Sequence, residues 1–193
     1  MRQTRSIATV TLRNYASRLL KPTAWIGRAD DLLRTADLLI PAVKEEYKWY
    51  FGKQQPRGTR AFQFDGPIPT FFMLTAFALE NLLKAALISQ QKEALRAKVE
   101  RDGKLPKLLS THDLYQLMDR LGVAPTEQFD EILVRRLTRA AEWYGRYPVP
   151  VTYRTYNTVR YANGKQYSLP TLGADDLKRL ARIIHVTRRQ LMV

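Results

Sequence analysis

One long apolar segment, residues 69–91, limits what this chain can fold into more than any other feature. Within residues 71–88 the polar side chains are Thr75, Glu80, Asn81 and Lys84. A helix that is apolar on nearly every side is buried in a protein, so we expect a central helix covered by others. A membrane-spanning helix is the alternative, but a charged pair and an amide near the bilayer centre would be costly. We therefore predict a buried helix and no membrane span.

The polar side chains of this segment fall on one narrow stripe. With about 3.6 residues per helical turn, Glu80, Asn81 and Lys84 share one side of the helix. Glu80 precedes Lys84 by four residues, which is the favourable order for a helical ion pair. Buried polar groups need partners. The residues that meet this stripe therefore form the candidate functional site.

Composition excludes several classes of function. The chain has 193 residues, which fits one domain, and no cysteine, which excludes disulfides, zinc–thiolate sites and thiol nucleophiles. Its two histidines are His112 and His185, too few for a multi-histidine metal site. The sequence also lacks a glycine-rich phosphate loop and a nucleophile elbow. We expect a cytoplasmic protein with no metal and no cofactor.

The net charge of +14 is concentrated in three stretches without Asp or Glu. Residues 1–29, 47–64 and 143–174 hold six, four and four cations, which equals the whole net charge. The remaining residues are therefore balanced. A soluble protein of high pI without an anionic partner is the alternative, but this segregation favours a basic surface for such a partner.

The first basic stretch is rich in arginine, as organellar transit peptides and basic arms are. We expect an arm, residues 1–27, that docks on a second unit, residues 28–193. A short amphipathic helix in the arm has these apolar positions: Leu12, Tyr15, Ala16, Leu19 and Leu20. Lys21-Pro22 should end it, because a residue before proline disfavours the helical conformation.

Apolar spacing predicts the helices around the central one. One covers residues 30–50, with a kink at Pro41, and a basic loop follows over residues 51–69. The central helix continues to residue 101, and Gly103 just beyond it ends the helix. The loop over residues 51–69 thus lies between two long helices, and its length indicates a functional or packed loop.

Three further helices are expected in the second half. A capping box from Ser110 to Asp113 opens a helix that Gly122 ends. Thr126 caps the next helix, which has Phe129 on its apolar face and stops before Pro148. The last helix covers residues 174–191, with Leu177, Leu180, Ala181 and Ile184 facing inward.

A β-hairpin is predicted before the last helix, at about residues 149–172. Asn163-Gly164 is a strong hairpin signal. Tyrosines and cations alternate around it, namely Arg154, Arg160, Tyr161, Lys165 and Tyr167. Such residues can stack bases and hold phosphates, or the tyrosines can simply pack on the helices. Both interpretations stay open.

Three motifs in order resemble the HEPN domain family. They are residues 77–87 (FALENLLKAAL), Thr111-His112-Asp113-Leu114 and Arg146-Tyr147-Pro148. Asp175, Ala181 and Ile184 suit the closing helix, so the resemblance covers about residues 30–191. It implies an all-α, antiparallel bundle of four or five helices, here with the hairpin as an insertion. The basic arm and the hairpin depart from the family pattern.

The resemblance also implies partners and activities. HEPN proteins are typically homodimers, and many bind RNA or nucleotides or pair with a nucleotidyltransferase-like protein in toxin–antitoxin or phage-defence systems. Some cleave RNA without metal, using an arginine followed four to six residues later by a histidine. No histidine follows Arg146 at that distance. Arg179 and His185 fit formally, but His185 borders the apolar face, which favours a core histidine over a catalyst.

The candidate site is expected where His112 and Arg146 approach the Glu80–Lys84 stripe. His112 and Arg146 are the catalytic candidates, with Arg179 and His185 as the alternative pair. The candidate RNA- or nucleotide-binding residues are Glu80, Lys84, His112, Arg146, Tyr147, Arg154, Arg160, Tyr161, Lys165 and Tyr167. A purely structural network is favoured over catalysis for Glu80 and His112. For Lys84 and Arg146 ligand binding and structure stay open.

Three functions follow from these patterns. The first is a non-catalytic module that binds RNA or a nucleotide. The second is a metal-independent endoribonuclease, as in a toxin. The third is an interaction protein whose basic face meets an acidic protein partner. Steep salt dependence of RNA binding separates the first from the third.

Overall fold

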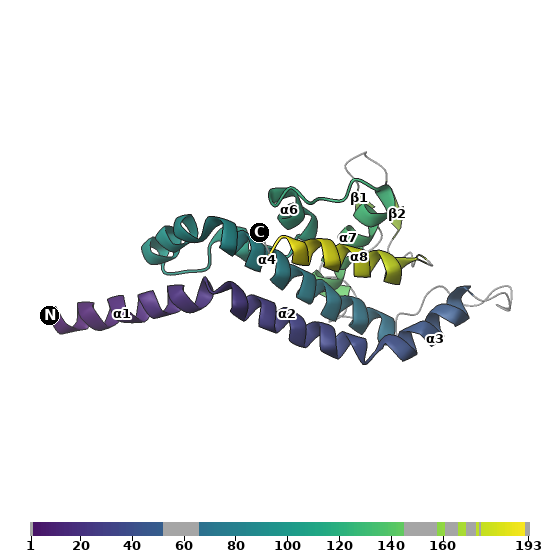
Figure 1. Ribbon diagram of the computed structural model, residues 1–193, viewed down its shortest axis with the longest axis horizontal. Helices are drawn as coiled ribbons and strands as arrows, with labels where there is room; N and C mark the ends of the chain where they lie inside the picture. Colours follow the sequence, from purple (N-terminus) through teal and green to yellow (C-terminus); the bar gives the residue numbers. More distant parts are fainter. Residues whose placement is uncertain are drawn as a thin grey trace.

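The computed structural model describes residues 2–51, 66–144, 158–160, 166–168, 173 and 175–191. These residues form a bundle that is helical almost throughout (Figure 1). Its helices are α1 (Arg2–Leu19), α2 (Pro22–Asp37), α3 (Ile40–Phe51), α4 (Pro67–Asp102), α5 (Lys107–Ser110), α6 (Leu114–Arg120), α7 (Gln128–Arg139), the π-helical turn η1 (Ala140–Tyr144) and α8 (Asp176–Arg189). The predicted all-α fold class is confirmed.

Helix α4 is the centre of the bundle, as the apolar segment predicts. α2 packs along it, and α1, α3, α6, α7, η1 and α8 also contact it (Figure 1). Gly103 ends α4 in the left-handed conformation, with φ of 64°, which costs a glycine little. At Gln91 the backbone leaves the helical region, with φ of −125°, and marks a kink.

By length and composition α4 could cross a membrane. However, 78% of its most apolar 18-residue window is buried within the protein. Phe71 and Phe72 in its first turns pack edge to face, with ring centroids 5.6 Å apart. This burial is that of a core helix, which is how we interpret α4.

The start of α4 is held by a carboxylate from α3. Oε2 of Glu46 accepts a hydrogen bond from the backbone N–H of Ile68 at 3.2 Å. A Cβ atom on Gly66 would lie 1.8 Å from Oε1 of Glu46. Glycine at this position therefore allows a negative charge to approach the positive end of the helix dipole.

The predicted single helix over residues 30–50 is wrong. The chain forms two helices, because α2 ends at Asp37 and α3 begins at Ile40. Pro41 has no N–H for the carbonyl of Asp37, and its ring would clash with that carbonyl. The chain therefore turns instead of kinking, with Leu39 N–H bonded to Ala36 O. The boundary predicted at residue 27 falls inside α2.

Two predicted helix caps are also wrong. Asp113, not Ser110, caps α6, and its Oδ1 accepts from the N–H of Gln116 at 3.0 Å. The hydroxyl of Ser110 instead donates to the carbonyl of Lys107 in α5. The N-cap of α7 is Glu127 and not Thr126. Asp113 lies three residues after Ser110, which is the last residue of α5, and Glu127 lies one residue after Thr126.

The predicted inward face of α8 is confirmed for Leu180, which is buried, and for Leu177 and Ile184, which pack against the core. Other positions on α7 and α8 differ from the prediction. Phe129 is 63% exposed, and Ala181 and His185 are also exposed. The buried face of α8 is instead formed by Asp176, Leu180, Ile183 and Thr187. The expectation that His185 is a core histidine is therefore wrong. Ion pairs between α7 and α8 accompany this packing, and apolar spacing does not reveal them.

A short antiparallel strand pair lies near the predicted insertion. β1 (Thr158–Arg160) pairs with β2 (Gln166–Ser168), and Arg160 is opposite Gln166. A two-residue turn at Asn163-Gly164 would place Tyr167 opposite Arg160, so the register differs by one residue. The turn itself lies outside the described residues. The hairpin insertion as a whole stays a prediction.

Candidate functional site

The polar stripe of α4 is a buried ion pair extended by a histidine. Nζ of Lys84 donates to Oε1 of Glu80 at 2.6 Å, and both side chains are buried. Nδ1 of His112 lies 2.9 Å from Oε2 of the same carboxylate. An ionised carboxylate only accepts, so we place the hydrogen of the imidazole on Nδ1. The expected hydrogen bond between His112 and the stripe is thus present.

His112 is presented by the loop between α5 and α6. Thr111 and Asp113 fix the loop, since Thr111 Oγ1 accepts from the N–H of Asp113 and Asp113 caps α6. The imidazole is 48% exposed, while Glu80 is buried beneath it. The stripe therefore has a buried, charge-paired part and a part that reaches the surface.

Trp25 joins the stripe from the other side and was missed by the sequence analysis. Its ring centroid lies 5.8 Å from Nζ of Lys84. Its indole Nε1 donates to the carbonyl of Leu19 at 2.7 Å. The indole is thus held between the end of α1, the start of α2 and the centre of α4. A tryptophan inside an acid-free basic stretch was the available signal.

An open cleft of about 360 Å³ lies beside Trp25. Its walls come from the end of α1, the start of α2 and the middle of α4, and they comprise Tyr15, Arg18, Leu19, Ala24, Trp25, Arg28 and Asn81. Asn81 belongs to the polar stripe, and its Nδ2 donates to the carbonyl of Phe77 at 2.6 Å. The stripe and the cleft are therefore parts of one continuous region.

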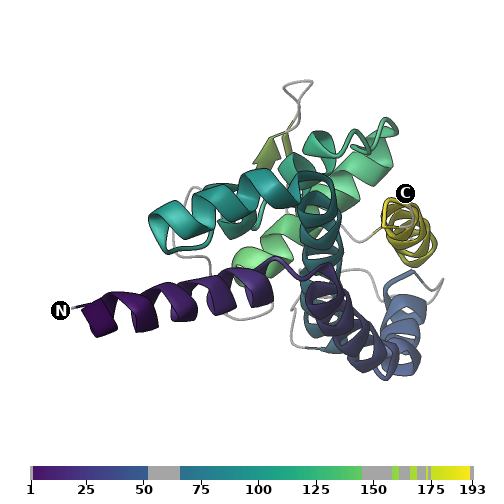
Figure 2. The same ribbon diagram turned by 60° about the vertical axis from the view of Figure 1, so that its left-hand side comes forward.

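The exposed cations of residues 11–29, two of which line this cleft, have no carboxylate partners among the described residues. Arg13, Arg18, Lys21 and Arg28 are exposed, and none of them forms an ion pair in the described part of the chain. α1, which contains Arg13 and Arg18, extends from the rest of the bundle toward the N-terminus (Figure 1, Figure 2), whereas Lys21 precedes α2 and Arg28 lies within it. The result is a surface of unopposed positive charge next to exposed aromatic rings.

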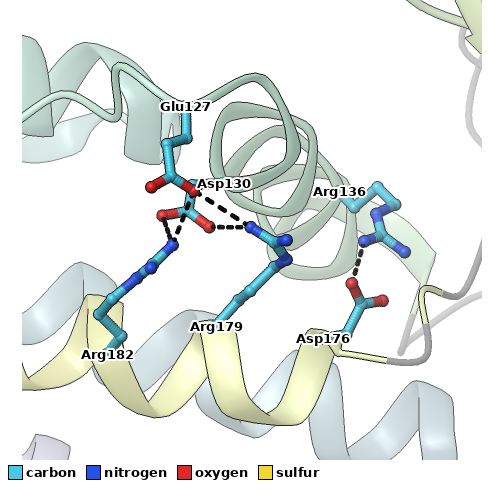
Figure 3. Close-up of polar contacts among 6 residues, drawn as sticks. All are labelled: Glu127, Asp130, Arg136, Asp176, Arg179 and Arg182. Atoms are coloured by element: carbon cyan, nitrogen blue, oxygen red, sulfur yellow. Dashed lines mark hydrogen bonds and ion pairs between the residues drawn. The ribbon is translucent and has the colours of Figure 1, made fainter.

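The arginines of α8 are used differently. Arg179 donates to Asp130 at 3.0 Å and to Glu127 at 3.4 Å, and Arg182 also binds both carboxylates (Figure 3). These hydrogen bonds raise the pKa of both guanidinium groups. In the same figure Arg136 donates to Asp176 at 2.8 Å. This cluster is charge-balanced and fastens α8 to α7.

The alternative catalytic pair is therefore not assembled in the described part of the chain. Arg179 is engaged with α7, whereas His185 is exposed and forms no hydrogen bond with it among the described residues. Arg179 also lies 5.2 Å from the ring centroid of Phe129. This arginine fastens two helices and is not free to hold a phosphate.

Other predicted site residues lie outside the described residues. They are Arg146, Tyr147, Arg154, Tyr161 and Lys165. For Arg160 and Tyr167 only the backbone is described, in β1 and β2. The approach of Arg146 to the stripe therefore stays a prediction, as do the roles of the hairpin side chains.

Within the described ranges, no group of three or more His, Cys, Asp or Glu residues is placed to hold a metal ion. Comparisons of this chain with protein-family models, with curated proteins and with solved structures find no match.

Proposed function

We propose that this protein binds RNA or a nucleotide without cleaving it, as a HEPN-like helical bundle with basic appendages. The observation that carries the proposal is a set of four exposed cations that form no ion pair among the described residues, namely Arg13, Arg18, Lys21 and Arg28. Two of them, Arg18 and Arg28, line an aromatic cleft. Elsewhere, much of the positive charge is neutralised within the fold, as for Arg179 and Arg182. Segregated charge costs self-repulsion, and an anionic partner would offset that cost.

The physical basis is counterion release. Each phosphate that a Lys or Arg neutralises releases a bound cation, so the logarithm of the affinity falls linearly with the logarithm of salt concentration. For single-stranded nucleic acid the slope is about 0.7 per phosphate contact. Four contacts would therefore produce a steep and measurable salt dependence.

The test is fluorescence anisotropy with labelled single-stranded RNA over a range of salt concentrations. Replacing Arg13 and Lys21 together with Gln should weaken binding and flatten the slope by about 1.4. The matched control is Lys107→Gln with Arg120→Gln, which removes the same charge from two exposed residues of α5 and α6. A parent protein that binds neither RNA nor a nucleotide at low salt would refute the proposal.

The hairpin belongs to the same proposal. Replacing Arg154, Arg160 and Lys165 together should weaken RNA binding and reduce its salt dependence. Replacing Tyr161 or Tyr167 should cost about 1–3 kcal/mol if either stacks on a base. If the folded triple variant binds RNA like the parent, we would infer that the basic stretches bind an acidic protein partner instead, such as a nucleotidyltransferase-like protein.

A second candidate, a metal-independent endoribonuclease, is favoured by one contact. Glu80 holds Nδ1 of His112 at 2.9 Å, which orients the imidazole as a general base requires. Cleavage would need that base at a 2′-hydroxyl and an arginine at the phosphorane, for which Arg146 is proposed. RNA cleavage in EDTA that disappears in His112→Ala but persists in His185→Ala would establish it. Intact RNA with all three proteins would eliminate it.

The assembly and location proposed are a homodimer in the cytoplasm. Sedimentation equilibrium of the purified protein, with and without RNA, measures the oligomeric state. A mass that stays at one chain across the micromolar range would refute the dimer.

A further inference from the structure

We infer that the cleft between α1 and α2 holds one unpaired nucleotide of single-stranded RNA, with its base against Trp25 and Tyr15 and its phosphate against Arg18 and Arg28. This inference rests on the proposed function and adds a place, a mode of contact and a preference for single strands. None of these four side chains was among the candidates from the sequence.

Trp25 provides a fixed aromatic surface. Its indole N–H is bonded to the carbonyl of Leu19 at 2.7 Å, and Lys84 lies 5.8 Å from its ring centroid. These two contacts restrain the indole, so little side-chain freedom is left to lose when a base stacks on it. Tyr15, which is 41% exposed, adds a second ring to the same cleft. Every base has an apolar face that stacks on such rings.

Each aromatic ring is accompanied by an arginine one helical turn later. Arg18 follows Tyr15 by three residues in α1, and Arg28 follows Trp25 by three residues in α2. Residues three apart share a helix face, and all four line the cleft. The same pattern on two helices places two cations beside two rings. This is the combination that a base with its phosphate requires.

The size and the remaining polar group agree with one nucleotide. A volume of about 360 Å³ lies near the lower end of the range for small-molecule sites. Asn81 uses Nδ2 on its own helix, so its Oδ1 is the acceptor that it offers a base amino group. An acidic peptide would satisfy the arginines but would leave the two rings unused.

The test is binding of a labelled octameric adenylate RNA to the full-length protein. Tyr15→Ala and Trp25→Leu should each weaken binding about 5- to 150-fold, the range that single stacked bases show. Arg18→Gln with Arg28→Gln should weaken binding and flatten its salt dependence. Duplex RNA should bind Tyr15→Ala and the parent equally. Tyr15 is exposed, so this variant tests the inference even if Trp25→Leu unfolds.

Matched controls separate the cleft from general charge and aromaticity. Phe129→Ala removes a ring that is 63% exposed on α7, and the Lys107→Gln, Arg120→Gln pair removes equal charge elsewhere. Both should bind the octamer within about twofold of the parent. Thermal melting by circular dichroism verifies that each variant is folded.

A second measurement, calorimetric titration with AMP, distinguishes this inference from the proposed function. If the octamer binds but the cleft variants behave like the controls, the inference is overturned and the RNA function stands. If AMP binds in a Tyr15-dependent way while RNA does not bind, the inference about single-stranded RNA is overturned and the proposed function stands in its nucleotide-binding form. If neither ligand binds, both are overturned.

Discussion

Nζ of Lys84 lies 5.8 Å from the centroid of the Trp25 ring while it donates to Glu80 at 2.6 Å. One ammonium group therefore joins a buried carboxylate to an aromatic ring at the edge of a cleft. Because Lys84 is itself buried, its cation–π contact is poorly screened and worth more than a surface contact. A substitution in the Glu80–Lys84 pair should therefore alter the contact between Lys84 and Trp25 at the edge of the cleft.

The buried pair should behave as a unit in stability measurements. Lys84→Met leaves the Glu80 charge with His112 alone, so we expect a loss of about 3–5 kcal/mol in the free energy of unfolding. The double variant Glu80→Gln, Lys84→Met should cost less than the sum of the single changes, because no charge is left unpaired. Urea denaturation of the four proteins measures the coupling. Additive losses would contradict it.

The capping of α4 by Glu46 predicts a second coupling. Gly66→Ala puts a Cβ 1.8 Å from the present position of Oε1 of Glu46, so the carboxylate must leave the N–H of Ile68. We expect a loss of about 0.5–2 kcal/mol, as for other helix caps. Glu46→Ala should cost a similar amount, and the double variant should cost little more. Thermal unfolding curves test this non-additivity.

Asp130 should be the main fastening point of α8. It is buried and accepts from Arg179 and Arg182, so Asp130→Asn should lower the free energy of unfolding by about 1–3 kcal/mol. Glu127 binds the same arginines but is 61% exposed. Glu127→Gln, the matched control, should therefore cost less than about 0.5 kcal/mol. Equal effects from the two variants would show that burial does not decide the contribution.

Tyr47 should make the fold sensitive to alkali. Burial raises its pKa above the ordinary 10.0, with Asp176 adding to the effect and Arg136 opposing it. The folded protein then holds the phenolic proton more tightly than the unfolded chain. This contribution to stability is complete below pH 10 and declines as the pH rises above it. Urea denaturation between about pH 8 and pH 11 should show a steeper loss for the parent than for Tyr47→Phe.

Local spacing was enough to predict the centre of this protein. The buried α4, its end at Gly103 and the Glu80–Lys84 pair all depend on residues a few positions apart on one helix. The contact of His112 with Glu80 spans 32 residues and was expected because buried polar groups need partners. The sequence predicts a kink at Pro41, where the chain instead turns between α2 and α3. The tertiary position of α3 decides between a kink and a turn.

The face of α8 and the cleft beside Trp25 could not be predicted in this way. Asp130 and Arg182 are 52 residues apart and pair across two helices, and Ala181 beside Arg182 is exposed. Residues of α1, α2 and α4 line the cleft together, so spacing within one helix does not predict it. Which helix is buried and which stretches are basic follow from the amino-acid sequence, because helical periodicity and charge are local. Only the tertiary structure decided which distant side chains meet, because packing and ion pairing between helices select one arrangement among many with similar local preference.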